Sequence, residues 1–571
     1  MSTAGPPVYA EPDAAVRAHV RPGMHVHCAA TMSRPNALIN ALARVFAGDK
    51  ALTVSVASVH SNAHALALSG AVRRVITGFL GDTYPSPRPN ILYRGAAGGE
   101  PFEVQAWSLL ALIQRLMAGA LGTPYAVTPS LAGSDLLADL GGDALALPVP
   151  GGDPAVLVKA LTPDVTLVHG LCADRRGNVV ICPPYGEGVW PALAARAGVV
   201  ASVERIVPDR VIDASPGRVM IPGARVIALC EAPFGAHPQS LSSDGTGGVR
   251  GYRDDYAFLA DITRRGRSVP GLRAWYQEWI CGPSGHGDYL DKMGKERLDG
   301  LLLACAADTS VDDAVCAPAR DGSGTEAEVT DQRRLVVLAA RTIADLVQRE
   351  GYSVLLAGIG ASHLACWTAE RLLRERGVRV QVCAELGFYG TAAASGDVYL
   401  FGQAHARRSQ ALLGTVEVLG GLVAGSHGRC LGVLGAAQVD RAGNVNTSRL
   451  ADGRWLTGSG GANDIASSAD CVVVAAATAR RYVERVDYVT SPGRRVRAVV
   501  SQFGRFVRDE PGGAFRLDGW LRGERAWASA AADVAAHTAW SVATDGCALE
   551  APPSARELAL VDELDPEGIY R

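Results

Sequence analysis

The chain contains two pairs of stretches that resemble each other, and this internal duplication restricts the fold more than any other feature. An apolar run followed by D-R-x-G-N-V occurs at 165–179 ("VTLVHGLCADRRGNV") and again at 431–445 ("LGVLGAAQVDRAGNV"). A second pair, 23–46 and 351–373, has an apolar run, a turn of small residues and then apolar residues at three- and four-residue spacing. Alternating strand and helix patterns are typical of α/β units with parallel sheets. We therefore predict two homologous α/β domains with mainly parallel sheets flanked by helices.

A polar stretch separates the two halves. Residues 316–334, "CAPARDGSGTEAEVTDQRR", are rich in Gly, Ser, Asp and Glu and lie between two apolar regions, as is typical of a linker. The 571 residues also exceed what one hydrophobic core supports. We predict a first domain at 1–315, a linker at 316–334 and a second domain at 335–571.

Charge and composition exclude several classes of partner. The formal net charge of -3 gives no basic surface for nucleic acid. The N-terminus lacks the pattern of a signal peptide, and no apolar run approaches the roughly twenty residues that span a membrane. The twelve cysteines include no C-x-x-C pair, which indicates reduced thiols and a cytoplasmic protein.

One carboxylate lies where a predicted strand meets a glycine turn. In "VRVQVCAELGFYG" (378–390), alternating apolar residues precede Glu385, and Gly387 and Gly390 follow it. A strand end flanked by glycines is open to a substrate, so Glu385 is a candidate nucleophile. Buried carboxylates are also commonly held in structural ion pairs. Taken alone, the residue leaves both interpretations open.

Other motifs predict backbone groups that face a ligand. "AGIGASH" (357–363) has His363 where a dinucleotide-binding fingerprint needs Gly or Ala, so we expect only a glycine turn whose N–H groups meet an anion or oxyanion. "TGSGGANDIASSAD" (457–470) is either a flexible turn with a helix cap or a loop that a ligand approaches closely. His25 and His27 share a strand face, but no Cys, Asp or Glu on that face completes a ligand set, so we predict no metal site.

Taken together, the motifs resemble the family I coenzyme A transferases, especially the glutaconate CoA-transferase-like branch. "CAELGFYG", "AGIGASHLA", "GAAQVDRAGNVNTS" and "GSGGANDIASSAD" are similar to the second subunit of that family. "FLGDTYPSPRPN", "ADRRGNV", "IPGARVIALCEAPFGAHP" and "WYQEWICGP" are similar to the first. The resemblance extends from about His25 to Phe506 and implies α and β subunits fused in one chain.

The resemblance implies a transferase that needs no permanently bound cofactor. Coenzyme A (CoA) would move from an acyl-CoA to a carboxylic acid through a glutamyl-CoA thioester on Glu385, and the fused chain would form a homodimer. The expected site residues fall into three groups. Oxyanion donors are expected at Gly358, Gly360, Ala361 and Thr31. CoA-binding residues are expected at Gly458, Ser459, Gly460, Gly461, Ala462 and Asn463. The substrate pocket is expected at Ser33, Arg34, Glu103, Phe388 and Tyr389.

The chain departs from the family at one motif, and other reactions stay open. Many members carry a G-x-G-G-F-type oxyanion motif where this chain has "HCAATMSRP" (27–35). Some relatives in the branch hydrolyse a carbon–carbon bond in steroid-ring CoA thioesters, and some decarboxylate glutaconyl-type thioesters, so an acyl-CoA hydrolase acting on a C–C bond or a thioester, or a decarboxylase, stays open. In a hydrolase, Glu103 would be the candidate base for water. A non-catalytic acyl-CoA binding protein is a further alternative, because a fold alone does not give a function.

Overall fold

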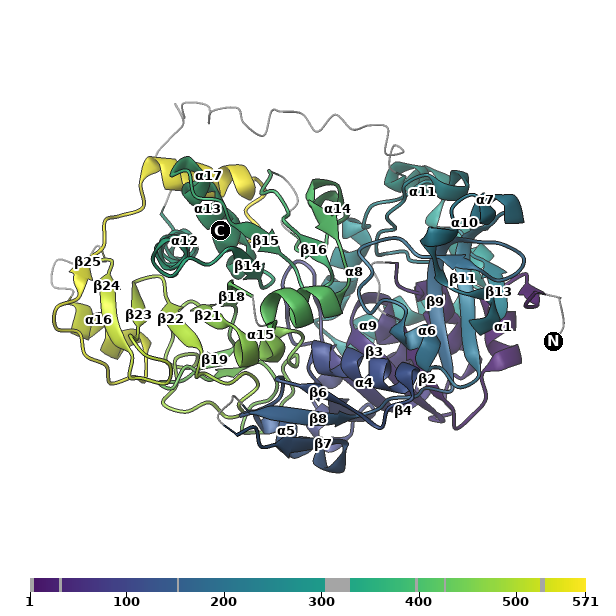
Figure 1. Ribbon diagram of the computed structural model, residues 1–571, viewed down its shortest axis with the longest axis horizontal. Helices are drawn as coiled ribbons and strands as arrows, with labels where there is room; N and C mark the ends of the chain where they lie inside the picture. Colours follow the sequence, from purple (N-terminus) through teal and green to yellow (C-terminus); the bar gives the residue numbers. More distant parts are fainter. Residues whose placement is uncertain are drawn as a thin grey trace.

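The fold is described on a computed structural model, which covers residues 5–29, 33–150, 154–302, 329–395, 399–425, 428–523 and 529–571. Each half of the chain forms a large sheet flanked by helices, and the two sheets lie side by side (Figure 1). The α/β prediction is therefore confirmed. No helix in these ranges is both long enough and apolar enough to cross a membrane.

The first half is built on a ten-stranded sheet whose main path is parallel throughout. In spatial order the strands of this path are β1 (Val8–Tyr9), β13 (Val226–Glu231), β11 (Gly198–Ile206), β9 (Val165–Ala173), β2 (His25–Cys28), β3 (Leu52–Val59), β4 (Val72–Leu80) and β5 (Glu103–Ala106). Two short strands, β10 (Val179–Val180) and β12 (Val219–Ile221), extend it off this path. Strand β9 is buried along its whole length, as expected where helices cover both faces of a parallel sheet.

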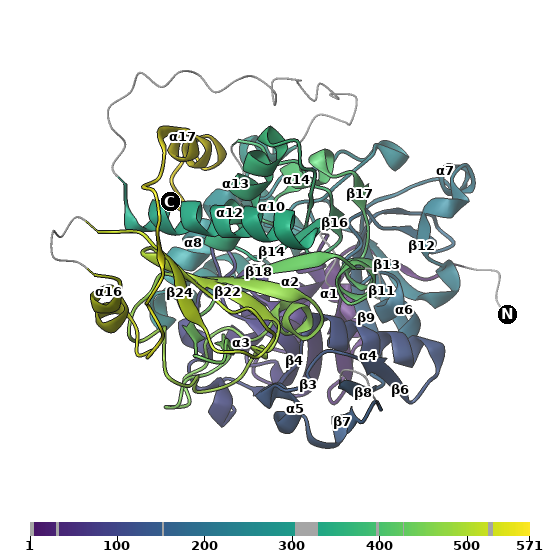
Figure 2. The same cartoon turned by 60° about the vertical axis from the view of Figure 1, so that its left-hand side comes forward.

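The helices of the first half lie around this sheet (Figures 1 and 2). They are α1 (Pro12–His19), α2 (Asn36–Val45), α3 (His64–Leu68), α4 (Leu109–Leu121), α5 (Asp135–Asp139), α6 (Trp190–Ala194), α7 (Asp209–Asp213), α8 (Tyr256–Arg265), α9 (Val269–Tyr276), α10 (His286–Met293) and α11 (Lys295–Leu301). A small antiparallel sheet of β6 (Tyr125–Thr128), β8 (Ala155–Lys159) and β7 (Ala144–Leu147) projects beside α4.

The second half is built on an eight-stranded, mainly parallel sheet. Its order is β15 (Gln381–Cys383), β14 (Val354–Ala357), β18 (Cys430–Leu434), β21 (Asp470–Val474), β22 (Val496–Val500), β23 (Gly504–Val507), β24 (Arg516–Trp520) and β25 (Ala548–Leu549). Two antiparallel strand pairs, β16 (Phe388–Tyr389) with β17 (Ala411–Leu412) and β19 (Gln438–Val439) with β20 (Val445–Asn446), form separate two-stranded sheets.

Both faces of the second sheet are covered. Along β14, Leu355 and Ala357 join one apolar core while Val354 and Leu356 join the other, because successive side chains of a strand point to opposite faces. The helices are α12 (Asp331–Glu350), α13 (Ala361–Glu375), α14 (Gln403–Arg408), α15 (Ala462–Ser468), α16 (Ala530–His537) and α17 (Ala555–Leu564), with a π-helical segment at Val416–Val423.

The repeated D-R-x-G-N-V stretches form the same turn in both halves. The Gly177 N–H donates to the Asp174 carbonyl, and the Gly443 N–H donates to the Asp440 carbonyl. Both glycines have a positive φ, 89° and 82°, which glycine adopts without the steric cost of a Cβ atom. The aspartate side chain caps the turn in each copy by accepting from the backbone N–H of the asparagine, at 2.9 Å. The sequence resemblance between the halves is thus also a structural one.

The end of the expected linker is helical. Helix α12 begins at Asp331 because the Thr330 side chain accepts from the Arg333 N–H as an N-cap, so 331–334 belong to the second half. The expected linker residues 316–328 lie outside the described ranges.

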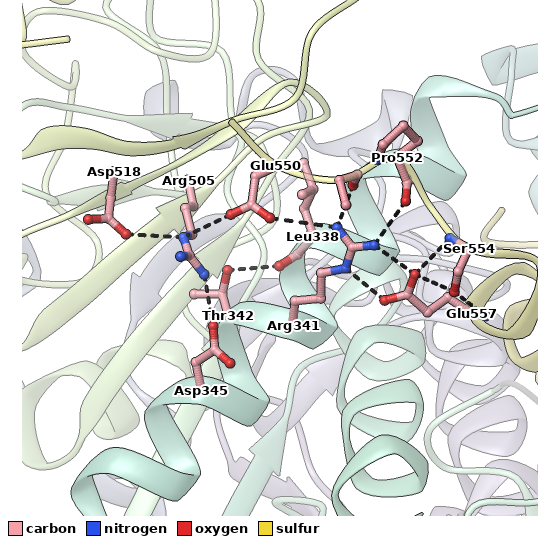
Figure 3. A network of polar contacts seen from close by, with 11 residues as sticks. Leu338, Arg341, Thr342, Asp345, Arg505, Asp518, Glu550, Pro552, Ser554 and Glu557 are labelled. Atoms are coloured by element: carbon pink, nitrogen blue, oxygen red, sulfur yellow. Dashed lines mark hydrogen bonds and ion pairs between the residues drawn. The ribbon is translucent and has the colours of Figure 1, made fainter. Parts of the chain in front are cut away.

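Helix α12 is also the anchor for the C-terminal part of the chain. Its Arg341 forms an ion pair with Glu557 at 2.7 Å and donates to the Ala551 and Pro552 carbonyls (Figure 3). Arg505 bridges Asp345 and Glu550 in the same network. These contacts hold β25 and α17 against α12 and β23 of the same half.

Candidate active site

Glu385 lies at the tip of a tight turn that follows β15. The Ala384 N–H donates to the Phe388 carbonyl at 3.0 Å, and the Gly387 N–H donates to the Ala384 carbonyl at 3.1 Å. Gly387 has a φ of 118°, and a Cβ atom there would overlap the Leu413 carbonyl oxygen. The glycine is therefore required for the turn, and the turn directs Glu385 away from the sheet.

The Glu385 carboxyl is partly buried and faces the loop around Gly461. The Gly461 N–H donates to this carboxyl, and a Cβ atom at position 461 would overlap Glu385 Oε2. Burial raises the pKa of Glu385 to about 7, and repulsion from Asp464 acts in the same direction, whereas the Gly461 hydrogen bond opposes it. A carboxyl with this pKa is ionised in part at neutral pH and is poorly solvated, as a reactive carboxylate needs to be.

The loop before α15 joins the two halves of the chain. The Gly460 N–H donates to the Gly78 carbonyl at 2.9 Å, and the Gly460 carbonyl accepts from the Leu109 N–H at 3.0 Å. Gly458 pairs with Phe79 at the end of β4 and donates to the Thr447 carbonyl. These backbone groups are already paired within the chain, so they offer CoA no free hydrogen-bonding group, and the expected CoA contact of Gly458 and Gly460 stays a prediction. Their partners lie in distant parts of the sequence and leave no local signal.

The first residues of α15 hold the same interface. Asn463 is fully buried; its Oδ1 accepts from the Leu131 N–H at 2.7 Å and its Nδ2 donates to the Thr490 carbonyl at 2.9 Å. Asn463 thus clamps Leu131 to Thr490, and its expected contact with CoA stays a prediction. Ser459 is 5% exposed and accepts from the Asn463 N–H, and Ala462 is the first residue of α15. Of the six residues expected to bind CoA, Gly461 is the one in contact with Glu385.

Asp464 is a second acidic group near Glu385. It is 1% exposed, and its Oδ2 accepts from the Leu110 N–H at the start of α4 at 2.9 Å. Burial raises the pKa of Asp464 to about 6. Helix α4 of the first half and the Asp464 carboxylate of the second half are therefore joined directly beside Glu385.

The glycine turn before α13 supplies part of the expected donor set. The Gly358 N–H donates to the Val433 carbonyl at 2.9 Å, so its expected role as an oxyanion donor is wrong. Gly360, with a φ of 93°, and Ala361 stand at the N-terminus of the fifteen-residue α13, where the first N–H groups of a helix lack intrahelical acceptors. Thr31, the expected donor from the first half, lies outside the described residues.

The predicted pocket residues separate into two places. Ser33 and Arg34 are buried, and Arg34 donates to the Ser58 carbonyl at 2.8 Å and lies 2.6 Å from His60 Nε2. Glu103 instead is exposed at the start of β5, opposite Arg74, and Arg74 precedes the Gly78 contact by four residues, about 13 Å of strand. Glu103 lines a separate surface pocket of about 700 Å³.

The two aromatic residues after Glu385 differ in burial. Phe388 is 0% exposed and belongs to the apolar core of the second half, and its expected role in shaping the substrate pocket stays a prediction. Tyr389 is partly buried, and its strand β16 pairs with β17 opposite Ala411.

A loop of the first half supports the Glu385 turn, and the sequence prediction missed it. The Tyr185 N–H donates to the Leu413 carbonyl at 2.7 Å, and the Gly186 N–H donates to the Leu386 carbonyl at 3.2 Å. The next residue, Glu187, is 1% exposed and lies 2.9 Å from His27 Nε2. The signal in the sequence was an acidic residue between two glycines, "PYGEG" (184–188).

No group of three or more His, Cys, Asp or Glu within the described ranges is arranged to hold a metal ion. His27 is fully buried and contacts one carboxylate, that of Glu187. Its role is therefore to support the loop around Glu187.

Comparison with known proteins gives a consistent assignment. Residues 9–232 match the family described as Coenzyme A transferase. An acyl-CoA transferase from Escherichia coli O157:H7 (YdiF) has the same fold: it aligns with a TM-score of 0.66 and 16% identity over 99% of this chain and 98% of its own. The CoA-transferase fold expected from the sequence is thus confirmed for both halves of the chain, within the residues that the structure describes.

The chain is also similar to both polypeptides of one two-subunit enzyme. It is 31% identical over 156 residues to one subunit of the glutaconate CoA-transferase of Acidaminococcus fermentans and 41% identical over 69 residues to the other. These matches cover 27% and 11% of this chain and 46% and 26% of the relatives. With one subunit of the 3-oxoadipate CoA-transferase of Pseudomonas knackmussii the identity is 32%, over 34% of this chain and 65% of the relative. Each match spans less than two thirds of the relative's own length.

Proposed function

We propose that this chain, whose residues 9–232 match the coenzyme A transferase family, transfers CoA between an acyl-CoA and a carboxylic acid through a thioester on Glu385. The observation that carries this proposal is the position of Glu385 at the junction of the halves, with a raised pKa and the Gly461 N–H directed at it. One E. coli relative of the same fold is described as a thioester complex with CoA, which supports a covalent route.

The proposed reaction begins with a Glu385 oxygen attacking the thioester carbonyl carbon. A C–O bond forms, the C–S bond breaks, and CoA leaves as a thiolate from an acyl–glutamyl anhydride. The thiolate then attacks the glutamyl carbonyl and releases the donor as a carboxylate. An acceptor carboxylate reverses both steps, so that Glu385 is regenerated and no ATP is consumed.

The tetrahedral intermediates carry an oxyanion that the site must stabilise. We assign this role to the N–H groups of Gly360 and Ala361 at the start of α13, where the helix dipole also favours negative charge. One such donor typically contributes about 3 kcal/mol at the transition state. Initial velocities measured with both substrates varied test the covalent route: parallel double-reciprocal lines are expected, and intersecting lines would count against it.

The acyl group is proposed to be that of a dicarboxylic acid. Arg34 is 6% exposed, and its hydrogen-bond partners, Ser58 and His60, are neutral. The Glu187 carboxylate acts on Arg34 through its charge, and no ion pair joins these two described residues, so the guanidinium can still bind a second carboxylate directly. The names of the relatives, glutaconate and 3-oxoadipate CoA-transferase, both refer to dicarboxylates. If this is right, Arg34→Met lowers kcat/KM for glutaryl-CoA far more than for butyryl-CoA; equal losses would refute it.

Hydrolysis, decarboxylation and simple binding are the alternatives. The position of Glu103 on the surface, beside Arg74, gives no support to its role as a base for water. A protein that only binds acyl-CoA has no need of a carboxylate at the thioester. Release of free CoA or a shortened acyl chain without an acceptor acid would favour the hydrolase or decarboxylase alternative.

We also propose a cytoplasmic homodimer. The cysteines in the described ranges are free thiols, which fits a reducing compartment. On the outer face of the small sheet, Val127 and Leu145 flank Leu157 in one cross-strand row, and Val127 is 57% exposed. Antiparallel sheets usually turn a polar face to water, and a second copy would cover this apolar row with its own by twofold symmetry. Light scattering tests this: Val127→Glu with Leu145→Glu should give monomers, whereas Leu549→Glu on the far half should not.

A further inference from the structure

A pocket of about 400 Å³ opens beside the Pro-rich loop of the first half. One wall is formed by loop residues 82–94 and the other by the end of α8 and the turn after it, residues 260–267. Thr263 Oγ1 on α8 donates to the Tyr84 carbonyl on the loop at 3.0 Å. This bond joins the two walls, so the pocket has a defined shape.

Positive charge dominates this pocket. Its lining includes four arginines, Arg88, Arg94, Arg264 and Arg267, and one acidic residue, Asp82. Asp82 is 7% exposed, and its Oδ1 is occupied by His64 and Asn90, each at 3.0 Å.

Three of these cations have no acidic partner. Arg264 is paired with Asp261, but Arg88, Arg94 and Arg267 form no ion pair within the part of the chain that the structure describes. Arginine is the side chain best suited to phosphate, because its planar fork donates two parallel hydrogen bonds. The pocket therefore favours a ligand with several phosphate oxygens.

The same loop leads from this pocket to the candidate active site. Ser86 lies 3.8 Å from where a Cβ atom of Gly360 would stand, at the start of α13. The Tyr84 ring stacks on Tyr256 at 4.8 Å and packs edge-on against Tyr399 of the second half. The loop thus has the arginines on one side and the oxyanion donors proposed for Glu385 chemistry on the other.

Glu385 itself leaves the sheet at the same edge as the Gly360 turn. Leu356 of β14 is paired with Cys383 of β15 in parallel register, so the residues that follow the two strands emerge side by side, about 5 Å apart. A ligand that reacts at Glu385 and passes the Pro-rich loop reaches the arginines if it has a long arm. Coenzyme A has this form, with a thiol at one end of a pantetheine arm and three phosphate groups at the other.

We propose that this arginine pocket, formed by Arg88, Arg94, Arg264 and Arg267, binds the diphosphate and 3′-phosphate of CoA. The inference rests on the proposed function and adds where the nucleotide end of the substrate is held. Binding energy from this remote end can be used at the reacting thioester, so the pocket contributes to catalysis as well as to affinity.

The test compares two substrates with the same thioester. Acyl-CoA carries the phosphates, and the corresponding acyl-pantetheine lacks them. For Arg88→Glu with Arg267→Glu, KM for acyl-CoA should rise about tenfold or more, because hydrogen bonds to charged groups contribute roughly 1.5–3 kcal/mol each. The kcat/KM for acyl-pantetheine should stay within about twofold of the wild-type value. The matched control is Arg273→Glu, an exposed arginine on the neighbouring helix α9 and outside the pocket.

Calorimetry with CoA separates this inference from the proposed function. Loss of CoA affinity in the double variant, with weaker loss of 3′-dephospho-CoA affinity, supports the pocket even if the wild-type protein transfers nothing. Unchanged CoA affinity, or equal damage to acyl-CoA and acyl-pantetheine turnover, would overturn it. Binding of inorganic phosphate to these arginines that leaves the affinity for CoA unchanged would overturn it too, since the pocket would then be a free-phosphate site.

Discussion

The Gly461 N–H donates to the carboxyl of Glu385, and the two residues are so close that a Cβ atom at position 461 would overlap Glu385 Oε2. They come from separate segments of the second half, and Gly461 is continuous with the loop that pairs with Gly78 and Leu109 of the first half. The position of the carboxylate therefore depends on how the two halves are joined.

Gly461→Ala should inactivate the enzyme without unfolding it. The new methyl group displaces the carboxylate, and a displacement of about 1 Å commonly costs about a hundredfold in rate. We expect kcat to fall by about this factor, with an unchanged melting temperature. Gly421→Ala is the control, because nothing lies within 4 Å of its added Cβ. Equal activity in both variants would show that Glu385 does not need this position.

The rate of the first half-reaction should follow ionisation of Glu385. Burial raises the pKa of this carboxyl to about 7, so the protonated, unreactive form predominates below neutrality. We expect kcat/KM for acyl-CoA to fall about tenfold per pH unit on the acid side of this value. Asp464→Asn removes a repulsive neighbour and should move the midpoint to lower pH, while the remote, exposed Asp509→Asn should not. A midpoint that Asp464→Asn leaves unchanged would contradict the assignment.

Replacing Glu385 should stabilise the protein at alkaline pH. Because the folded state raises the pKa of Glu385 from 4.5 to about 7, ionisation disfavours the folded state. This destabilisation is complete above about pH 7, the pKa of Glu385 in the folded state, and disappears below its pKa of 4.5 in the unfolded state. Glu385→Gln should therefore raise the free energy of unfolding by about 2 kcal/mol at pH 8 and by almost nothing at pH 4. Urea denaturation at the two pH values measures this difference, and an equal effect at both would argue against a desolvated carboxylate at Glu385.

Glu187 should act by holding the Glu385 turn in place. It lies 2.9 Å from His27 Nε2, and the adjacent Gly186 N–H donates to the Leu386 carbonyl. Glu187→Ala leaves the buried His27 ring without this partner, which typically costs about 1–3 kcal/mol, and should lower kcat while leaving KM for acyl-CoA unchanged. Glu187→Gln keeps one hydrogen bond to His27 and should restore most of the rate. If Gln restores stability but no activity, Glu187 takes part in the chemistry directly.

The sequence was informative where a residue's role is decided by its neighbours along the chain. The strand, the glycine turn and the carboxylate at 381–387 are all local features, and so are the two D-R-x-G-N-V turns. Gly458, Gly460 and Asn463 were expected to face CoA because small residues before a helix leave room for a ligand. Their backbone and side-chain groups are instead bonded to Thr447, Gly78, Leu131 and Thr490. Contacts of this kind are decided by tertiary structure, and no local spacing encodes them.

The central claim is that Glu385 becomes covalently bound to CoA, and peptide mass spectrometry after incubation with acyl-CoA tests it most directly. The proposal predicts that the peptide containing Glu385 gains the mass of CoA less one water, that borohydride removes the adduct, and that Glu385→Gln never forms it. A wild-type protein that turns over acyl-CoA with an acceptor acid but gives no adduct, or one whose adduct persists in Glu385→Gln, would contradict it.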